Sequence, residues 1–316
     1  MANAKPDIVT LEAFLPFVEE WLDASFTAHR VWSAPDREAA IDALRDKAIG
    51  IAALGHNRVD GPLLDRLPKA KIVSLMSVGY DGIDVGAAKT RGVAVTNTPD
   101  VLTDDVADLA IALTIAASRQ IITGDRYLRS GKWLNGHMGL AQSINGRTMG
   151  ILGMGRIGMA IARRAEACGM KVAYGVRAKK PELAWPYYAS VVDLAQASDI
   201  LVIAIPGGAD TRHMVDAKAL DALGPDGILV NIARGSVVDE AALIAALGSK
   251  RLGGAALDVF ADEPRVPKAL IDMEHVVLQP HVGSATYQTR AKMGRLMIDN
   301  LLRHFSGKPL LTPVTG

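Results

Sequence analysis

Three residues have the types and surroundings needed for carbonyl reduction: Arg234, Glu263 and His281. They lie in the runs ILVNIARGSVVDEAAL, ALDVFADEP and VVLQPHVGSA, each close behind an apolar, strand-like stretch. An imidazole that titrates near neutral pH can donate a proton to a ketone oxygen while hydride adds to the carbon. Glu263 can keep that imidazolium charged, and Arg234 can bind a substrate carboxylate and polarise the carbonyl. The sequence therefore predicts an enzyme that reduces a 2-keto acid.

A glycine-rich turn upstream, GILGMGRIG, is expected to hold the hydride carrier. Gly153, Gly155 and Gly158 follow an apolar strand and open a helix, which is the context that a G-x-G-x-x-G motif requires. The first glycine permits the tight turn, the second lets the backbone approach a pyrophosphate, and the third allows close helix packing. The phosphates would then meet the N-terminal amides of the helix. This pattern predicts a dinucleotide site.

The end of the next predicted strand indicates which dinucleotide is preferred. NAD-binding proteins usually present an Asp or Glu to the ribose 2′-hydroxyl about 20 residues after the motif. Gly175 occupies that place here, and Arg177, Lys179 and Lys180 follow it. A guanidinium can bind a 2′-phosphate through two charge-assisted hydrogen bonds. We therefore predict NADP(H) as the preferred cofactor, with NAD(H) possible. The alternative interpretation is that these cations belong to a solvent-exposed basic loop with no role in binding.

Short apolar runs alternate with helical stretches, which predicts an α/β fold with parallel sheets. GIAAL, KIVSLMSV and VAVTNT are expected to be strands of one open sheet, and RTMGILG through KVAYGV begins a nucleotide-binding half. The stretch from Thr103 to Gly131 predicts one long helix that crosses between domains. Two further strands are expected to end near Pro206 and Arg234. In open α/β sheets, ligands bind outside the carboxyl ends of the strands.

Composition and charge argue against several classes of protein. A chain of 316 residues favours two domains, and 35 basic against 34 acidic residues create no field that would attract nucleic acid. No apolar run reaches the roughly 18 residues of a membrane span, and the start of the chain lacks a signal-peptide pattern. We expect a cytoplasmic protein with no nucleic-acid or membrane partner and no metal site.

Five motifs in this order resemble the D-isomer-specific 2-hydroxyacid dehydrogenase family: SVGYDGIDVGAAKTRGVAVTNTP, GMGRIG, NIARGSVVDE, DVFADEP and QPHVGSAT. The resemblance covers essentially the whole chain and is strongest to NADP-dependent glyoxylate and hydroxypyruvate reductases. It implies that Arg234, Glu263 and His281 form the catalytic triad. It also implies that the backbone amides of Val78 and Gly79 bind the substrate carboxylate. The further cofactor contacts that it implies are Thr103, Arg156, Ile157, Ile205, Pro206, Thr211, Ala233, Asp258, Gly283 and Ser284, with Asp258 at the nicotinamide amide.

The resemblance also implies an architecture. Two Rossmann-like domains with parallel sheets are expected, with a cofactor domain of residues 99–286 inserted into a flavodoxin-like substrate domain of residues 1–98 and 287–316. The active site would lie between them and close by a hinge motion. Family members are typically homodimers through the cofactor domain, and the helix from Thr103 is expected at the centre of that interface. KWLNGHMGL is a candidate to reach the partner's site, with Trp133 interpreted as interface packing.

The identity of the substrate stays open at this stage. Glyoxylate and hydroxypyruvate fit a small pocket, and bulkier aryl pyruvates or 2-ketogluconate are the alternatives. The loops LGHNRVDG and SVGYDG would contact the substituent, but the sequence assigns no role to their charged groups. A nucleotide-sensing corepressor that binds protein partners is a hypothesis from a different class.

Overall fold

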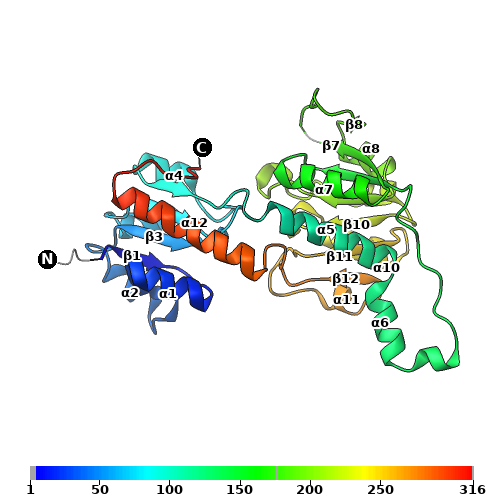
Figure 1. Cartoon of the computed structure of the whole chain (residues 1–316), viewed down its shortest axis with the longest axis horizontal. Helices are drawn as coiled ribbons and strands as arrows, with labels where there is room; N and C mark the ends of the chain where they lie inside the picture. The colour runs from blue at the N-terminus through cyan, green and yellow to red at the C-terminus, as the bar shows by residue number, and fades with distance from the viewer. Residues whose placement is uncertain (1–4, 176, 315–316) are drawn as a thin grey trace. The chain divides into compact units, whose positions relative to one another are not determined.

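The computed structural model describes residues 5–175 and 177–314, which form two compact units (Figure 1). The first unit comprises the chain up to Leu102 and from Thr286 onward, and the second unit is Thr103–Ala285. Each unit is built on a sheet whose described strands all pair in parallel, with helices in the connections. The predicted α/β class is confirmed.

The sheet of the first unit has the strand order β2-β1-β3-β4-β5. This is the flavodoxin-like order, in which the chain reverses direction across the sheet between β1 and β3 and ligands bind at that point. The described part of this unit also contains five α-helices and one 3-10 turn. The elements are β1 (Asp7–Thr10), α1 (Pro16–Ser25), β2 (Thr27–Arg30), η1 (Val31–Ser33), α2 (Arg37–Asp42), β3 (Gly50–Ala53), α3 (Gly61–Arg66), β4 (Ile72–Leu75), α4 (Val85–Thr90), β5 (Ala94–Thr96) and α12 (Tyr287–Phe305).

Helix α12 belongs to the first unit although the whole second unit separates it in sequence from the other elements of that unit (Figure 1). It packs against α1 and β4. The buried Ser74 hydroxyl donates to the Met297 carbonyl at 2.9 Å, across 223 positions of the chain. A Cβ at Gly50 would lie only 2.9 Å from the Phe305 ring, so β3 depends on glycine for room beneath the helix. The last long helix therefore completes the core of the first unit.

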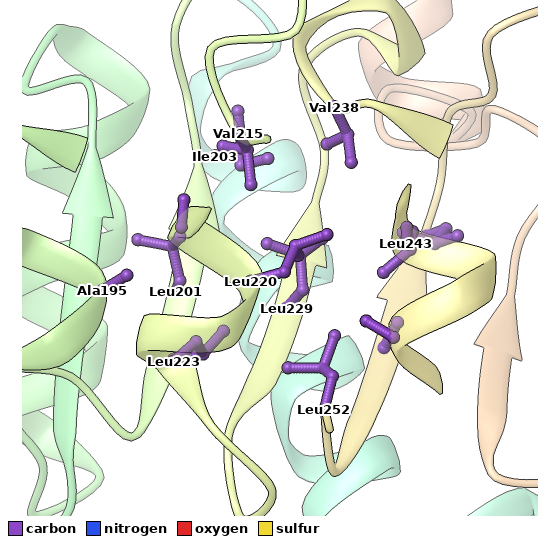
Figure 2. Close-up of a cluster of buried hydrophobic side chains, with 14 of the residues drawn as sticks. Ala195, Leu201, Ile203, Val215, Leu220, Leu223, Leu229, Val238, Leu243 and Leu252 are labelled. Carbon is purple, nitrogen blue, oxygen red and sulfur yellow. The ribbon is translucent and has the colours of Figure 1, made fainter. Parts of the chain in front are cut away.

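The second unit has a seven-stranded sheet in the order β12-β11-β10-β9-β6-β7-β8. Leucine, isoleucine, valine and alanine side chains from α8, β9, α9, β10 and α10 interdigitate on one face of it (Figure 2). The elements are α5 (Thr103–Ser118), α6 (Ile121–Arg129), η2 (Lys132–Asn135), β6 (Thr148–Leu152), α7 (Arg156–Ala167), β7 (Lys171–Gly175), β8 (Tyr187–Tyr188), α8 (Val191–Gln196), β9 (Ile200–Ile203), η3 (Ala209–Thr211), α9 (Ala217–Leu223), β10 (Ile228–Asn231), η4 (Gly235–Val237), α10 (Glu240–Gly248), β11 (Gly254–Leu257), α11 (Lys268–Ile271) and β12 (Val276–Leu278).

The prediction of one long helix from Thr103 to Gly131 is wrong, because α5 and α6 are separate helices bent by 57°. Gln120 between them has a φ of +52°, a left-handed conformation that a right-handed helix cannot continue through. Helix α5 buries Val106 and Ile111 and packs on α7, β10 and β11. In the described part of the chain, no single helix is long and apolar enough to cross a membrane; only the bent α5–α6 pair passes that test.

Candidate active site

One edge of the seven-stranded sheet collects the predicted site residues of the second unit. In a parallel sheet the carboxyl ends of all strands meet at the same edge, and the connecting loops leave from there. Gly153 and Gly155 follow β6, Arg177 and Lys179 follow β7, Ile205 and Pro206 follow β9 with Thr211 in η3, Ala233 and Arg234 follow β10, Asp258 and Glu263 follow β11, and His281, Gly283 and Ser284 follow β12; Arg156, Ile157 and Gly158 begin α7, and Thr103 begins α5.

The turn between β6 and α7 has the shape that a dinucleotide requires. Gly153 has a φ of +105°, and a Cβ there would lie 2.6 Å from the Ala204 carbonyl oxygen. A Cβ at Gly158 would lie 2.0 Å from the Gly153 carbonyl oxygen, so the helix packs directly on the turn. A Cβ at Gly155 would meet no described atom within 4 Å, and no side chain caps the helix there. Open space in front of uncapped helix amides fits a pyrophosphate.

Asp258 holds the backbone that carries His281. Its carboxylate is buried and accepts hydrogen bonds from the amides of Val282 at 2.7 Å and Gly283 at 2.8 Å. Burial raises the pKa of Asp258, and the two amide hydrogen bonds act in the opposite direction. The Asp258 carbonyl also accepts the His281 amide at 2.9 Å, and His281 has a left-handed φ of +54°. A strained backbone held by a buried carboxylate is a feature that clusters at functional sites.

His281 and Glu263, two of the residues predicted to be catalytic, form a hydrogen-bonded pair. The Nδ1 atom of His281 lies 2.7 Å from Glu263 Oε2, and Glu263 Oε1 accepts the Phe260 amide at 3.0 Å. Burial alone would raise the pKa of Glu263, but the hydrogen bonds from His281 and Phe260 lower it below its usual value. Glu263 is therefore a fixed carboxylate that orients the ring and leaves Nε2 of His281 for another ligand.

Arg234 is presented by a loop that its neighbours shape. The buried Asn231 side chain donates to the Arg234 carbonyl at 2.9 Å and accepts the Ala233 amide at 3.0 Å. A Cβ at Gly235 would lie 1.9 Å from the carbonyl carbon of Phe260, so this loop packs on the turn that leads to Glu263. The three predicted catalytic residues thus come from loops that are packed or hydrogen-bonded to one another.

The end of β7 has the basic character that the sequence predicted. Gly175 ends the strand, and Arg177 follows with an 82% exposed side chain. Its guanidinium pairs with Asp210 Oδ2 at 2.7 Å. Asp210 was not predicted, because it lies in η3, on a different loop.

Val78 and Gly79 lie in the first unit, in the loop after β4. Asn97 donates to the Val78 carbonyl at 2.8 Å, and Ser77 donates to the Gly79 carbonyl at 2.8 Å. Both carbonyls are thus engaged, which fixes the conformation of this loop. The carboxyl edge of this five-stranded sheet also carries a histidine–carboxylate pair, Glu12 with His56, which was not predicted from the sequence.

A glycine-lined nucleotide turn and a carboxylate-oriented histidine, both at the carboxyl edge of one parallel sheet, are the features of a nicotinamide-dependent oxidoreductase. The chain belongs to the D-isomer specific 2-hydroxyacid dehydrogenase family, and residues 111–283 match the NAD binding domain of that family. It is 50% identical to a glyoxylate/hydroxypyruvate reductase of Arabidopsis thaliana over 94% of this chain and 95% of the relative. It is 43% identical to 2-ketogluconate reductase of Gluconobacter oxydans over 99% of both chains.

A solved structure extends the comparison to three dimensions. The NADPH-dependent glyoxylate/hydroxypyruvate reductase of Sinorhizobium meliloti, in complex with NADP and malonate, superposes with a TM-score of 0.90. The two proteins are 42% identical, and the match covers 99% of this chain and 97% of that one. The family predicted from the sequence motifs is confirmed.

Proposed function

We propose that this protein reduces a small 2-keto acid, glyoxylate or hydroxypyruvate, to the D-2-hydroxy acid with NADPH. The observation that carries the proposal is the 2.7 Å contact between His281 Nδ1 and Glu263 Oε2. That contact fixes the ring and leaves one imidazole nitrogen for the substrate oxygen. The names of the relatives, which include glyoxylate/hydroxypyruvate reductases, support the substrate class.

In this mechanism each residue has one role. Nε2 of His281 donates a proton to the keto oxygen in reduction and takes it back in oxidation. The negative charge of Glu263 stabilises the imidazolium before the proton leaves. Arg234 binds the substrate carboxylate and polarises the carbonyl, and the amides of Val78 and Gly79 bind the same carboxylate. The nicotinamide, when bound, supplies the hydride that adds to the keto carbon.

The residues after β7 support NADPH as the preferred cofactor, with NADH as the weaker one. Gly175 places no carboxylate at the strand end, and the exposed guanidinium of Arg177, which pairs with Asp210, can bind the 2′-phosphate in exchange for that carboxylate. Lys179 adds a second positive charge on the same loop. The Sinorhizobium relative is itself NADPH-dependent and was solved with NADP.

We assign the cofactor to residues 99–286 and the substrate to residues 1–98 and 287–316. The proposed cofactor contacts comprise the residues that line the carboxyl edge of the seven-stranded sheet: Thr103, Gly153, Gly155, Arg156, Ile157, Gly158, Arg177, Lys179, Ile205, Pro206, Thr211, Ala233, Asp258, Gly283 and Ser284. The glycine turn and the uncapped start of α7 support this assignment most directly.

We also propose a homodimer. Large apolar side chains are exposed along α6 and the segment after it: Ile121, Leu128, Trp133, Leu134 and Leu140. This segment extends away from the seven-stranded sheet (Figure 1). Helix α6 belongs to the stretch from Thr103 that was predicted to be the centre of the interface, and the buried residues of α5 pack inside their own unit. Exposed apolar patches of this kind are typical of surfaces that a partner covers.

Initial rates test the proposal, measured at the nicotinamide absorbance with glyoxylate and hydroxypyruvate and with each of NADPH and NADH. We expect turnover of both acids and a strong preference for NADPH. Turnover with NADH alone would overturn the cofactor preference. Turnover of only 2-ketogluconate or aryl pyruvates would replace the small substrate by a bulkier one, and the absence of any turnover would favour a nucleotide-sensing role.

A further inference from the structure

The switch point of the five-stranded sheet carries a polar pair that the proposed reaction does not use. In the order β2-β1-β3-β4-β5, ligands bind where the connections after β1 and β3 diverge. Glu12 follows β1, and His56 follows β3. The Nε2 atom of His56 lies 2.7 Å from Glu12 Oε2. Two residues 44 positions apart thus meet at the place where this fold binds its ligands.

The pair is held in position by its neighbours. Asn57 donates to the same Glu12 oxygen at 2.8 Å, and Asn57 Oδ1 accepts the Leu54 amide at 2.7 Å. Glu12 is thereby held by both Asn57 and His56, and its contact with Nε2 orients the imidazole ring of His56. The imidazole is 67% exposed, and within residues 5–175 and 177–314 its Nδ1 atom has no hydrogen-bond partner. An oriented, solvent-facing imidazole nitrogen is a ready hydrogen-bonding group for a ligand.

The loop of His56 packs directly on the loop proposed to bind the substrate carboxylate. A Cβ at Gly55 would lie 1.8 Å from the Gly79 carbonyl oxygen, and the Gly82 amide donates to the Gly55 carbonyl at 2.8 Å. A Cβ at Gly82 would lie 2.7 Å from the His56 carbonyl oxygen. The loop that carries His56 is therefore the direct neighbour of the loop proposed to bind the substrate carboxylate.

We propose that His56, oriented by Glu12, binds an oxygen on C3 of the 2-keto acid and makes the enzyme selective for 3-hydroxylated substrates. This inference rests on the proposed function, because it concerns the substituent of the same substrate. An imidazole nitrogen can exchange a hydrogen bond with a hydroxyl, whereas a hydrogen or methyl group offers none.

The test compares two substrates that differ by one hydroxyl, hydroxypyruvate and pyruvate. For His56→Leu we expect the ratio of kcat/KM for hydroxypyruvate to that for pyruvate to fall about three- to tenfold, the range of one hydrogen bond. His56→Gln keeps an N–H donor and is expected to retain more of the ratio than His56→Leu. His29→Leu is the matched control, because His29 pairs with Asp7 at 2.7 Å at the other end of β1, and its ratio should equal that of the wild type.

The outcomes separate this inference from the proposed function. A ratio that His56→Leu leaves unchanged, whether both substrates slow together or neither does, would overturn the role of His56. Equal losses of the ratio in the Leu and Gln variants would contradict the hydrogen bond. A wild-type protein that reduces no 2-keto acid would overturn the proposed function itself.

Discussion

Two histidine–carboxylate pairs with the same 2.7 Å separation occupy the carboxyl ends of the two sheets, yet their surroundings differ. The backbone of His281 is held by a buried aspartate in a left-handed conformation, and Glu263 is fixed by a backbone amide. The side chains of Glu12 and His56 are more exposed than those of the first pair. Glu12 is held by a hydrogen bond from the side chain of Asn57 rather than from a backbone amide.

The difference separates two tasks. A proton donor must keep its geometry through the reaction, because small displacements of reacting groups cost large factors in rate. A group that selects among substituents needs only to favour one hydrogen-bonding partner over another. We therefore expect changes at the first pair to affect every substrate and changes at the second pair to alter the choice among them.

The largest effect should follow loss of the proton donor. His281→Gln is expected to lower kcat by about 100- to 10,000-fold, because general acid catalysis contributes on that scale. The loss should be equal for glyoxylate, hydroxypyruvate and pyruvate, measured under saturating NADPH. His275→Gln, an exposed histidine just before β12, is the control and should match the wild type. A loss of activity confined to hydroxypyruvate would contradict the assignment of catalysis to the His281 pair and of substrate choice to the His56 pair.

A smaller effect should appear at the cofactor and leave the choice of keto acid alone. Arg177→Ala is expected to weaken NADPH binding by roughly tenfold to a hundredfold, since hydrogen bonds between charged groups contribute about 1.5–3 kcal/mol. NADH binding should change little, as fluorescence titration of both cofactors would report. Lys268→Ala removes another exposed cation that pairs with an aspartate, and it should leave NADPH affinity as it is. An unchanged NADPH affinity in Arg177→Ala would refute the role of Arg177.

The smallest effect concerns stability at the first pair. The folded structure lowers the pKa of Glu263, so the carboxylate stabilises the fold above its unfolded pKa and loses that contribution as the pH falls through the folded value. Wild type and Glu263→Gln should therefore differ most near neutral pH and converge once the pH has fallen below the lowered folded pKa of Glu263. We expect less than about 1 kcal/mol, because side chains that are 34% and 48% exposed are screened by solvent. Denaturant unfolding at several pH values measures this, and a difference that grows on acidification would contradict it.

Local patterns were sufficient to single out Arg234, Glu263 and His281 as candidates and to place the glycine turn, because each follows an apolar strand within a short stretch of sequence. The Glu12–His56 pair could not be predicted in this way, since it depends on β1 and β3 being neighbours in the sheet. The break at Gln120 was missed because glutamine has no preference for the left-handed region and the helical pattern continues through it. The roles of Asn231 and Asp258 in shaping loops are likewise tertiary effects.

Helix α12 has a consequence for the order in which the protein can mature on the ribosome. Synthesis produces the five strands of the first unit early, but the helix that covers Ser74 and Gly50 emerges only after the whole second unit. Domains generally fold as units, and unfinished ones expose apolar surface that promotes aggregation. The second unit, continuous in sequence, can fold first. The nascent first unit therefore passes through a prolonged vulnerable stage, and its solubility during translation depends on how soon the closing helix arrives.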